Sequence, residues 1–215
     1  MLTTLLTLFA SSFVIGLSGA LMPGPLLTAT IGESLRRGFV AGPLLVAGHA
    51  ILELALVAAV LLGLAPFLQQ PAVFGVIALA GGVILLWMAW GMFRSLPRLS
   101  LSWERGERRG NHPLAAGILL SAANPYWIIW WATIGLGYIL YSRGFGLAGV
   151  AFFFAGHILA DLLWYSLVSA AVAGGRHFLT DRIYRGLIAA CAAFLVLFAL
   201  YFAYAGLAKL PPPPW

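Results

Sequence analysis

Six long apolar stretches, each able to cross a lipid bilayer, constrain this chain more than any other feature. A membrane-spanning helix needs roughly 20 apolar residues. The stretches are continuously apolar rather than alternating, which favours helices over barrel strands. We therefore expect an all-α integral membrane protein with six transmembrane helices. Their approximate ranges are Thr4–Leu35, Phe39–Leu64, Pro71–Phe93, Pro113–Tyr141, Gly146–Ala173 and Ile183–Leu207.

The composition excludes a water-soluble enzyme and a disordered chain. Hydrophobic residues make up 62% of the 215 residues and charged residues only 8%, whereas an average soluble domain is roughly 45–50% apolar and about 25% charged. Six spans fill residues 1–215 as a single transmembrane domain. The net charge of +6 forms no continuous basic face, so we expect no nucleic-acid partner. The single cysteine, Cys191, excludes an intrachain disulfide.

The basic residues divide unevenly between the two sides of the expected helices. Arg143 and Lys209 stand on one side. Because cytoplasmic loops are enriched in lysine and arginine, we expect the three loops on the other side, between spans 1 and 2, 3 and 4, and 5 and 6, to be cytoplasmic. We therefore expect a multi-pass protein of the cell (inner) membrane with both termini outside. The residues in those loops and their flanks are Arg36, Arg37, Arg94, Arg98, Arg105, Arg108, Arg109, Arg176, Arg182 and Arg185.

The two halves of the chain contain three similar features in the same order. Each half has a proline-interrupted span, an Arg-Gly-Phe turn and a Gly-His-x-x-x-acid motif. Three spans per half place the second copy upside down, so we expect an inverted 3+3 repeat. Repeat 1 covers about 1–95, a cytoplasmic loop about 96–112 and repeat 2 about 113–210. Such repeats are typical of secondary transporters, whose site lies where the repeats meet.

Spans 1 and 4 are interrupted at Pro23-Gly24-Pro25 and at Asn124-Pro125. A helix that restarts after Pro25 has unpaired N–H groups and a partial positive charge at its start, which suits a carboxylate. A simple kink is the alternative, since proline and glycine are common in membrane helices. Aromatic residues, including Trp130 and Trp131, follow the second break and either line a cavity or mark the membrane interface. The expected substrate-binding residues are Pro23, Gly24, Pro25, Asn124, Pro125, Tyr126 and Trp127.

Two histidine–acid pairs lie inside spans 2 and 5. His49 and Glu53 are four residues apart, as are His157 and Asp161, so each pair shares one helix face. Ionisable groups inside a span face a cavity or a partner, and we expect these four to couple transport to protons. Two alternatives stay open: a structural hydrogen bond from each histidine to its own acid, and a divalent-metal site. A third acidic ligand is lacking in the pattern, so we expect no metal and no cofactor.

The chain resembles the LysE/RhtB family of amino-acid exporters over nearly its whole length. The resemblance is carried by Gly19-Ala-Leu-Met-Pro-Gly-Pro25, Arg36-Arg37-Gly38, the run Leu-Leu-Trp-Met-Ala-Trp-Gly-Met-Phe-Arg-Ser at 85–95, and Asn124-Pro125. It implies export of amino acids or related small metabolites from the cytoplasm by proton antiport. Tyr126-Trp127 replaces the lysine that many members have after Asn-Pro, which indicates a divergent branch.

Three alternatives compete with an exporter of small zwitterions, one of them within transport. A divalent metal or ion carrier would use the same histidines and acids. A membrane-embedded enzyme is disfavoured, because the sequence has no HExxH, GxSxG or phosphate-binding glycine loop, so we expect no enzyme. A structural membrane protein would have little reason to keep acids inside its spans. The small residues at Gly81-Gly82 and Gly186-x-x-x-Ala190 predict close helix contacts, within one chain or in a homo-oligomer.

Overall fold

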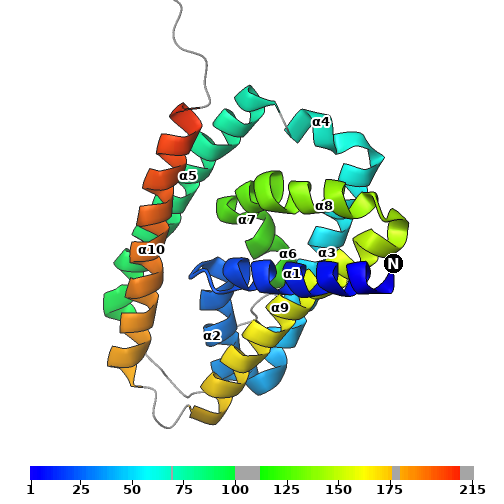
Figure 1. The fold of residues 1–215 in the computed structure, drawn as a ribbon. Helices are drawn as coiled ribbons and strands as arrows, with labels where there is room; N and C mark the ends of the chain where they lie inside the picture. The colour runs from blue at the N-terminus through cyan, green and yellow to red at the C-terminus, as the bar shows by residue number, and fades with distance from the viewer. Residues whose placement is uncertain (69, 100–111, 176–179, 209–215) are drawn as a thin grey trace, which may run out of the picture.

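A computed structural model describes residues 1–68, 70–99, 112–175 and 180–208, and its regular elements in these ranges are all helices (Figure 1). A 3₁₀ turn, Gly38–Val40, joins α2 to α3, and π-helical turns follow α3 at Val60–Leu64 and α7 at Trp131–Gly135. The helices are α1 (Leu2–Ala20), α2 (Pro25–Arg37), α3 (Ala41–Ala59), α4 (Ala65–Leu68), α5 (Pro71–Ser95), α6 (Pro113–Ala122), α7 (Pro125–Trp130), α8 (Leu136–Arg143), α9 (Gly146–Gly175) and α10 (Asp181–Leu207).

Five of these helical segments are long and apolar enough to cross a membrane, and a sixth appears if the bent pair α6 and α7–α8 counts as one span. That pair bends by 63° between Ala122 and Pro125. An all-helical membrane protein with five to six spans is therefore confirmed for the described residues. Part of the expected orientation falls on Arg105, Arg108, Arg109, Arg176 and Lys209, which lie outside the described residues.

The first two spans have other bounds than hydropathy predicts. The expected span Thr4–Leu35 is divided into α1, which is long enough to cross a membrane alone, and α2, which continues into α3 as one helical segment over Pro25–Leu68. The 3₁₀ turn at Gly38 makes this continuation, and Gly38 has a φ of 76°, a conformation that glycine adopts without steric cost. A hydropathy window detects apolar length but not such a turn.

Proline is the first residue of four helices: α2, α5, α6 and α7. The missing N–H of proline is harmless there, because the first N–H groups of a helix have no partner within it. The same residues that end an apolar run in the sequence therefore begin the next helix. Two of these four starts, those of α2 and α7, lie at the breaks in the first and fourth expected spans.

Three helix pairs form most of the fold: α1 with α9, α3 with α6, and α5 with α10. Figure 1 shows α5 and α10 side by side at one edge of the molecule, with α7 directed toward them. Glycines bring α3 and α6 into backbone contact. A Cβ added at Gly48 would overlap the carbonyl of Leu114, and one added at Gly117 would overlap the carbonyl of Leu45.

The contact of α1 with α9 is built in the same way. A Cβ at Gly156 would lie 3.1 Å from the carbonyl carbon of Phe9 and still closer to its oxygen. The Ser12 hydroxyl donates a hydrogen bond of 2.8 Å to the carbonyl of Phe153. Each of the three pairs therefore joins one helix from the first half of the chain to one from the second half.

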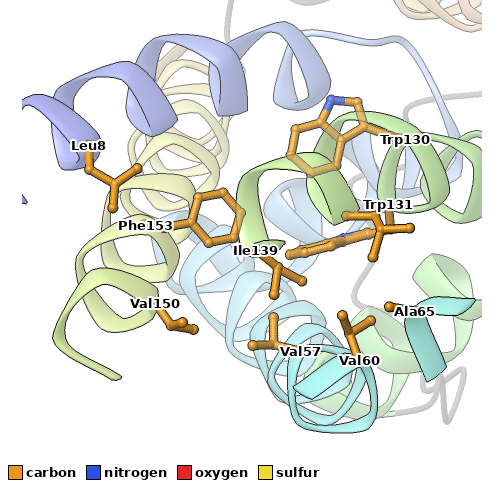
Figure 2. Close-up of a cluster of buried hydrophobic side chains, with 10 residues drawn as sticks. Leu8, Val57, Val60, Ala65, Trp130, Trp131, Ile139, Val150 and Phe153 are labelled. Atoms are coloured by element: carbon orange, nitrogen blue, oxygen red, sulfur yellow. The ribbon is translucent and has the colours of Figure 1, made fainter. Parts of the chain in front are cut away.

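A large buried apolar cluster lies where the start of α1, the end of α3, α8 and the start of α9 come together. Figure 2 shows its side chains, with the Trp130 and Trp131 rings beside aliphatic residues of the neighbouring helices. It stabilises the fold through van der Waals packing between these helices. Its members are Leu8, Val57, Val60, Ala65, Trp130, Trp131, Leu136, Ile139, Val150 and Phe153.

Candidate functional site

Four ionisable side chains from two helices meet inside the membrane region. His49 and Glu53 lie on α3, and His157 and Asp161 lie on α9. All four are buried, with exposed fractions between 1% and 7%. One nitrogen or carboxylate oxygen from each lies within 4.8 Å of those of the other three. We call these four residues the His–acid tetrad.

Glu53 is the centre of the tetrad. Its carboxylate lies 2.9 Å from Nε2 of His49, on its own helix, and 3.1 Å from Nε2 of His157, on the other helix. Asp161 is more loosely placed, because its Oδ2 lies 3.6 Å from His157 Nε2 and 3.8 Å from His49 Nε2. The expected alternative of one bond from each histidine to its own acid fits α3 only. His157 instead links α9 to α3 through Glu53.

Two indole N–H groups also bind Glu53. The Nε1 atoms of Trp127 and Trp131 donate to Glu53 Oε1 over 2.9 Å and 2.7 Å. The sequence pattern places both tryptophans after the second break, as residues of a cavity or of the membrane interface, but it does not predict these bonds. Their spacing of four residues, which puts both on one face of a helix, is the signal that could have revealed a shared partner. The segment α7 is thereby tied to α3.

The two histidines have further neighbours. His49 Nδ1 lies 2.6 Å from the hydroxyl of Ser121 on α6, a residue that the sequence motifs do not include. Ser121 precedes Asn124 by one helical turn, so its position beside the break is the available signal. The ring of Trp130 stacks on His157 at 4.7 Å between centroids and 26° between planes. Ser121 and Trp130 therefore hold the two imidazole rings in place.

Two buried polar atoms of the tetrad have no hydrogen-bond partner among the described residues. They are His157 Nδ1 and Asp161 Oδ2, whereas Glu53 Oε2 has His157 Nε2 3.1 Å away. Buried polar atoms are nearly always paired, so each unpaired one calls for an explanation. Asp161 is the clearest case, because both histidines lie beyond hydrogen-bonding distance of its Oδ2. The arrangement can accept a proton or a positively charged group at this oxygen.

The two helix breaks lie next to each other. A Cβ built on Gly24 would be 3.7 Å from Nδ2 of Asn124. Asn124 accepts a hydrogen bond of 3.1 Å from the Tyr126 backbone N–H through its Oδ1 and so caps α7. The start of α2, in contrast, has no side-chain cap among the described residues, which leaves its first N–H groups available to a ligand.

The breaks and the tetrad face a common pocket. Five of the expected substrate-binding residues line it: Pro23, Gly24, Asn124, Tyr126 and Trp127. The four tetrad residues line it as well, with Ser121 and Trp130. Pro25 and Pro125 are not among the lining residues. Both are buried in the first turns of α2 and α7, and Pro125 packs against Gly81 of α5.

This chain matches a known family of membrane proteins in sequence. The model of the LysE type translocators aligns with residues 17–206, which contain both breaks and the tetrad. The chain belongs to the LysE type translocator family. The protein is therefore a membrane transporter, and the resemblance seen in its motifs is confirmed.

Two curated relatives extend over most of this LysE type translocator. It is 24% identical over 208 residues to a protein named putative amino acid efflux protein YcgF of Bacillus subtilis, covering 95% of this chain and 99% of that protein. It is 26% identical over 169 residues to the chemotactic transduction protein ChpE of Pseudomonas aeruginosa, covering 78% of this chain and 83% of that protein. No solved structure gives a significant match.

Proposed function

We propose that this translocator is a secondary exporter that moves amino acids or closely related small zwitterions out of the cytoplasm in exchange for protons. One observation carries the proposal. The two helix breaks and the buried His–acid tetrad line the same pocket. The pocket thus combines a start of a helix, which favours an anion, with a carboxylate that favours a cation. The name of the Bacillus relative, an amino acid efflux protein, agrees with this substrate class.

The zwitterion would bind with its two charges on opposite sides of the pocket. Its carboxylate meets the uncapped start of α2 at Gly24, with the amide of Asn124 beside it. Its ammonium meets Asp161, whose Oδ2 has no hydrogen-bond partner in the described part of the chain. Glu53 is less available, because two indole N–H groups and two imidazoles already contact its carboxylate.

The tetrad would exchange protons with the two sides of the membrane. Its imidazoles and carboxylates share protons over short distances, and a bound ammonium at Asp161 competes with a proton for the same oxygen. Such competition couples the two movements in a carrier that opens to one side at a time and changes sides only when loaded, because substrate and proton then occupy the pocket in alternation.

The helix pairing supports an inverted repeat. Gly48 on α3 contacts the Leu114 carbonyl of α6, and the corresponding Gly156 on α9 contacts the Phe9 carbonyl of α1. The helix pairs α3–α6 and α1–α9 would be exchanged by a two-fold axis in the membrane plane. Transporters of this kind alternate between two states by moving one repeat against the other around a fixed site. The cytoplasmic side is the side of the arginine-rich loops.

Uptake of labelled amino acids into inverted membrane vesicles with an acidic interior tests this function. Wild-type vesicles should accumulate substrate, and collapsing the pH gradient should abolish accumulation. Glu53→Gln and Asp161→Asn should each lower gradient-driven uptake at least tenfold. The matched control is Glu33→Gln, because Glu33 pairs with Arg36 and Arg37 at 3.1 and 2.7 Å away from the pocket. Unchanged uptake in both pocket variants would refute the role in proton coupling.

A divalent metal carrier is the second candidate, and the compactness of the tetrad favours it. Two imidazoles and two carboxylates with ligand atoms within 4.8 Å form a donor set that suits first-row divalent metals. Thermal unfolding of the purified protein with Zn²⁺ or Mn²⁺ distinguishes the candidates, since a ligand of the folded state raises apparent stability. The metal carrier would be favoured if the metal stabilises the protein, if His49→Ala loses this stabilisation and if the control His112→Ala keeps it.

A further inference from the structure

The substrate pocket has two chemically different sides. The tetrad, Ser121 and the two breaks make one side polar. The other side consists of apolar and aromatic side chains from α5, α7 and α10. These residues are Leu85 of α5, Tyr126 of α7, and Phe194, Leu195 and Phe198 of α10. We call them the aromatic wall.

The rings of the aromatic wall are held in a continuous surface. Tyr126 meets Phe198 edge to face, with 5.2 Å between ring centroids and 83° between planes. Phe194 stacks on Phe198 at 5.0 Å and 25°. Phe202 stacks behind Tyr126 at 6.3 Å and is fully buried. Such contacts fix ring positions, so the wall offers a preformed apolar surface to a ligand rather than a flexible one.

The charged residues that line the pocket limit which charged side chains a substrate can have. None of the described residues that line it is lysine or arginine. Of its two carboxylates, Glu53 is occupied by indole and imidazole groups, and Asp161 is needed for the α-ammonium. A basic side chain would therefore lack a carboxylate partner. An acidic one would find only the two histidines, whose Nε2 atoms already contact Glu53. Desolvating an unpaired charge is costly.

We infer that the side chain of the bound amino acid lies on the aromatic wall and that the substrates are neutral amino acids with branched aliphatic or aromatic side chains. This inference rests on the proposed function, because it takes the two polar anchors of the zwitterion from it. An apolar side chain on this wall loses contact with water and gains ring contacts. Alanine would make the polar contacts only.

Counterflow in proteoliposomes containing the purified protein tests the inference. The probes are labelled leucine, phenylalanine, alanine, lysine and glutamate, each at the same concentration. Leucine or phenylalanine should exceed lysine and glutamate at least tenfold in kcat/KM, since one methylene group in an apolar pocket already changes this ratio about tenfold or more. Preference for lysine or glutamate would overturn the inference and leave the proposed exporter standing. Failure to transport any amino acid would overturn both.

Variants of α10 connect the preference to the wall. Phe198→Ala should lower the kcat/KM ratio of phenylalanine to alanine about tenfold, mainly through a higher KM for phenylalanine. Phe198→Leu, which keeps most of the volume, should change the ratio less and serves if the alanine variant does not fold. The matched control is Leu197→Ala, because Leu197 is 62% exposed on the outer face of the same helix. A ratio that changes equally in Leu197→Ala, or that stays unchanged in both Phe198 variants, would refute this assignment.

Discussion

Replacing Trp131 by phenylalanine removes one of the two indole donors to the buried Glu53 carboxylate. Trp131 Nε1 lies 2.7 Å from Glu53 Oε1, and the tryptophan is only 2% exposed. A hydrogen bond to a charged group contributes about 1.5–3 kcal/mol. We expect the free energy of unfolding to fall by that amount, in addition to the packing lost with the larger ring. For a chain of this size, 1 kcal/mol shifts Tm by about 2–4 °C, so the bond alone accounts for about 3–12 °C.

The control for this prediction is Trp164→Phe on α9. The indole nitrogen of Trp164 is buried and has no hydrogen-bond partner in the described ranges, so the same substitution there removes packing without removing a bond. Both variants are compared with wild type by thermal unfolding in the same detergent. A third measurement repeats Trp131→Phe in the Glu53→Gln background. There the substitution should lower the free energy of unfolding by less, because a hydrogen bond to a neutral acceptor contributes only about 0.5–1.5 kcal/mol. Equal Tm losses for the two tryptophan variants would refute the reasoning.

Two further predictions concern helix packing and capping. Gly48→Ala should lower Tm by several degrees, because its Cβ would overlap the Leu114 carbonyl and overpacking costs about 1–3 kcal/mol; Gly91→Ala, with open space around it, should be neutral or stabilising. Thr180→Ala removes the side chain that accepts from Ile183 N–H at the start of α10 and should cost about 0.5–2 kcal/mol. Thermal unfolding checks both predictions. If Gly91→Ala lowered Tm as much as Gly48→Ala does, the first prediction would be contradicted.

Local patterns in the sequence predict the local parts of this structure. Apolar length predicts the membrane helices, although not the bounds of the first two. The spacing of Glu33 before Arg36 and Arg37 allows ion pairs one turn apart, and the structure contains both. The repeated Gly-His-x-x-x-acid motif is sufficient by itself to select the four residues of the tetrad. For the ion pairs and the tetrad the information lies within about one helical turn of the residue, and for the membrane helices within one span.

Contacts between distant segments are beyond such patterns. Helical periodicity places His157 and Asp161 on one face, but it does not reveal that His157 binds Glu53 104 residues away. The bonds from the two indoles and from Ser121 depend likewise on how α6 and α7 pack against α3. The two Arg-Gly-Phe turns also differ in a way that their shared letters hide. The residue with positive φ is Gly38 in the first turn and Gly146, two residues after Gly144, in the second.

The pairing of α1 with α9 has a consequence for how the protein is made. Ser12 binds the carbonyl of Phe153, 141 residues later in the chain. Ribosomes add about 5–20 residues per second, so α1 waits roughly 7–28 s after its synthesis before its main neighbour exists. During that interval α1 must be held in the bilayer by lipid or by the insertion machinery. Neither half, expressed alone, would contain the partner for its first helix, and the two halves expressed as separate chains should be recovered only together.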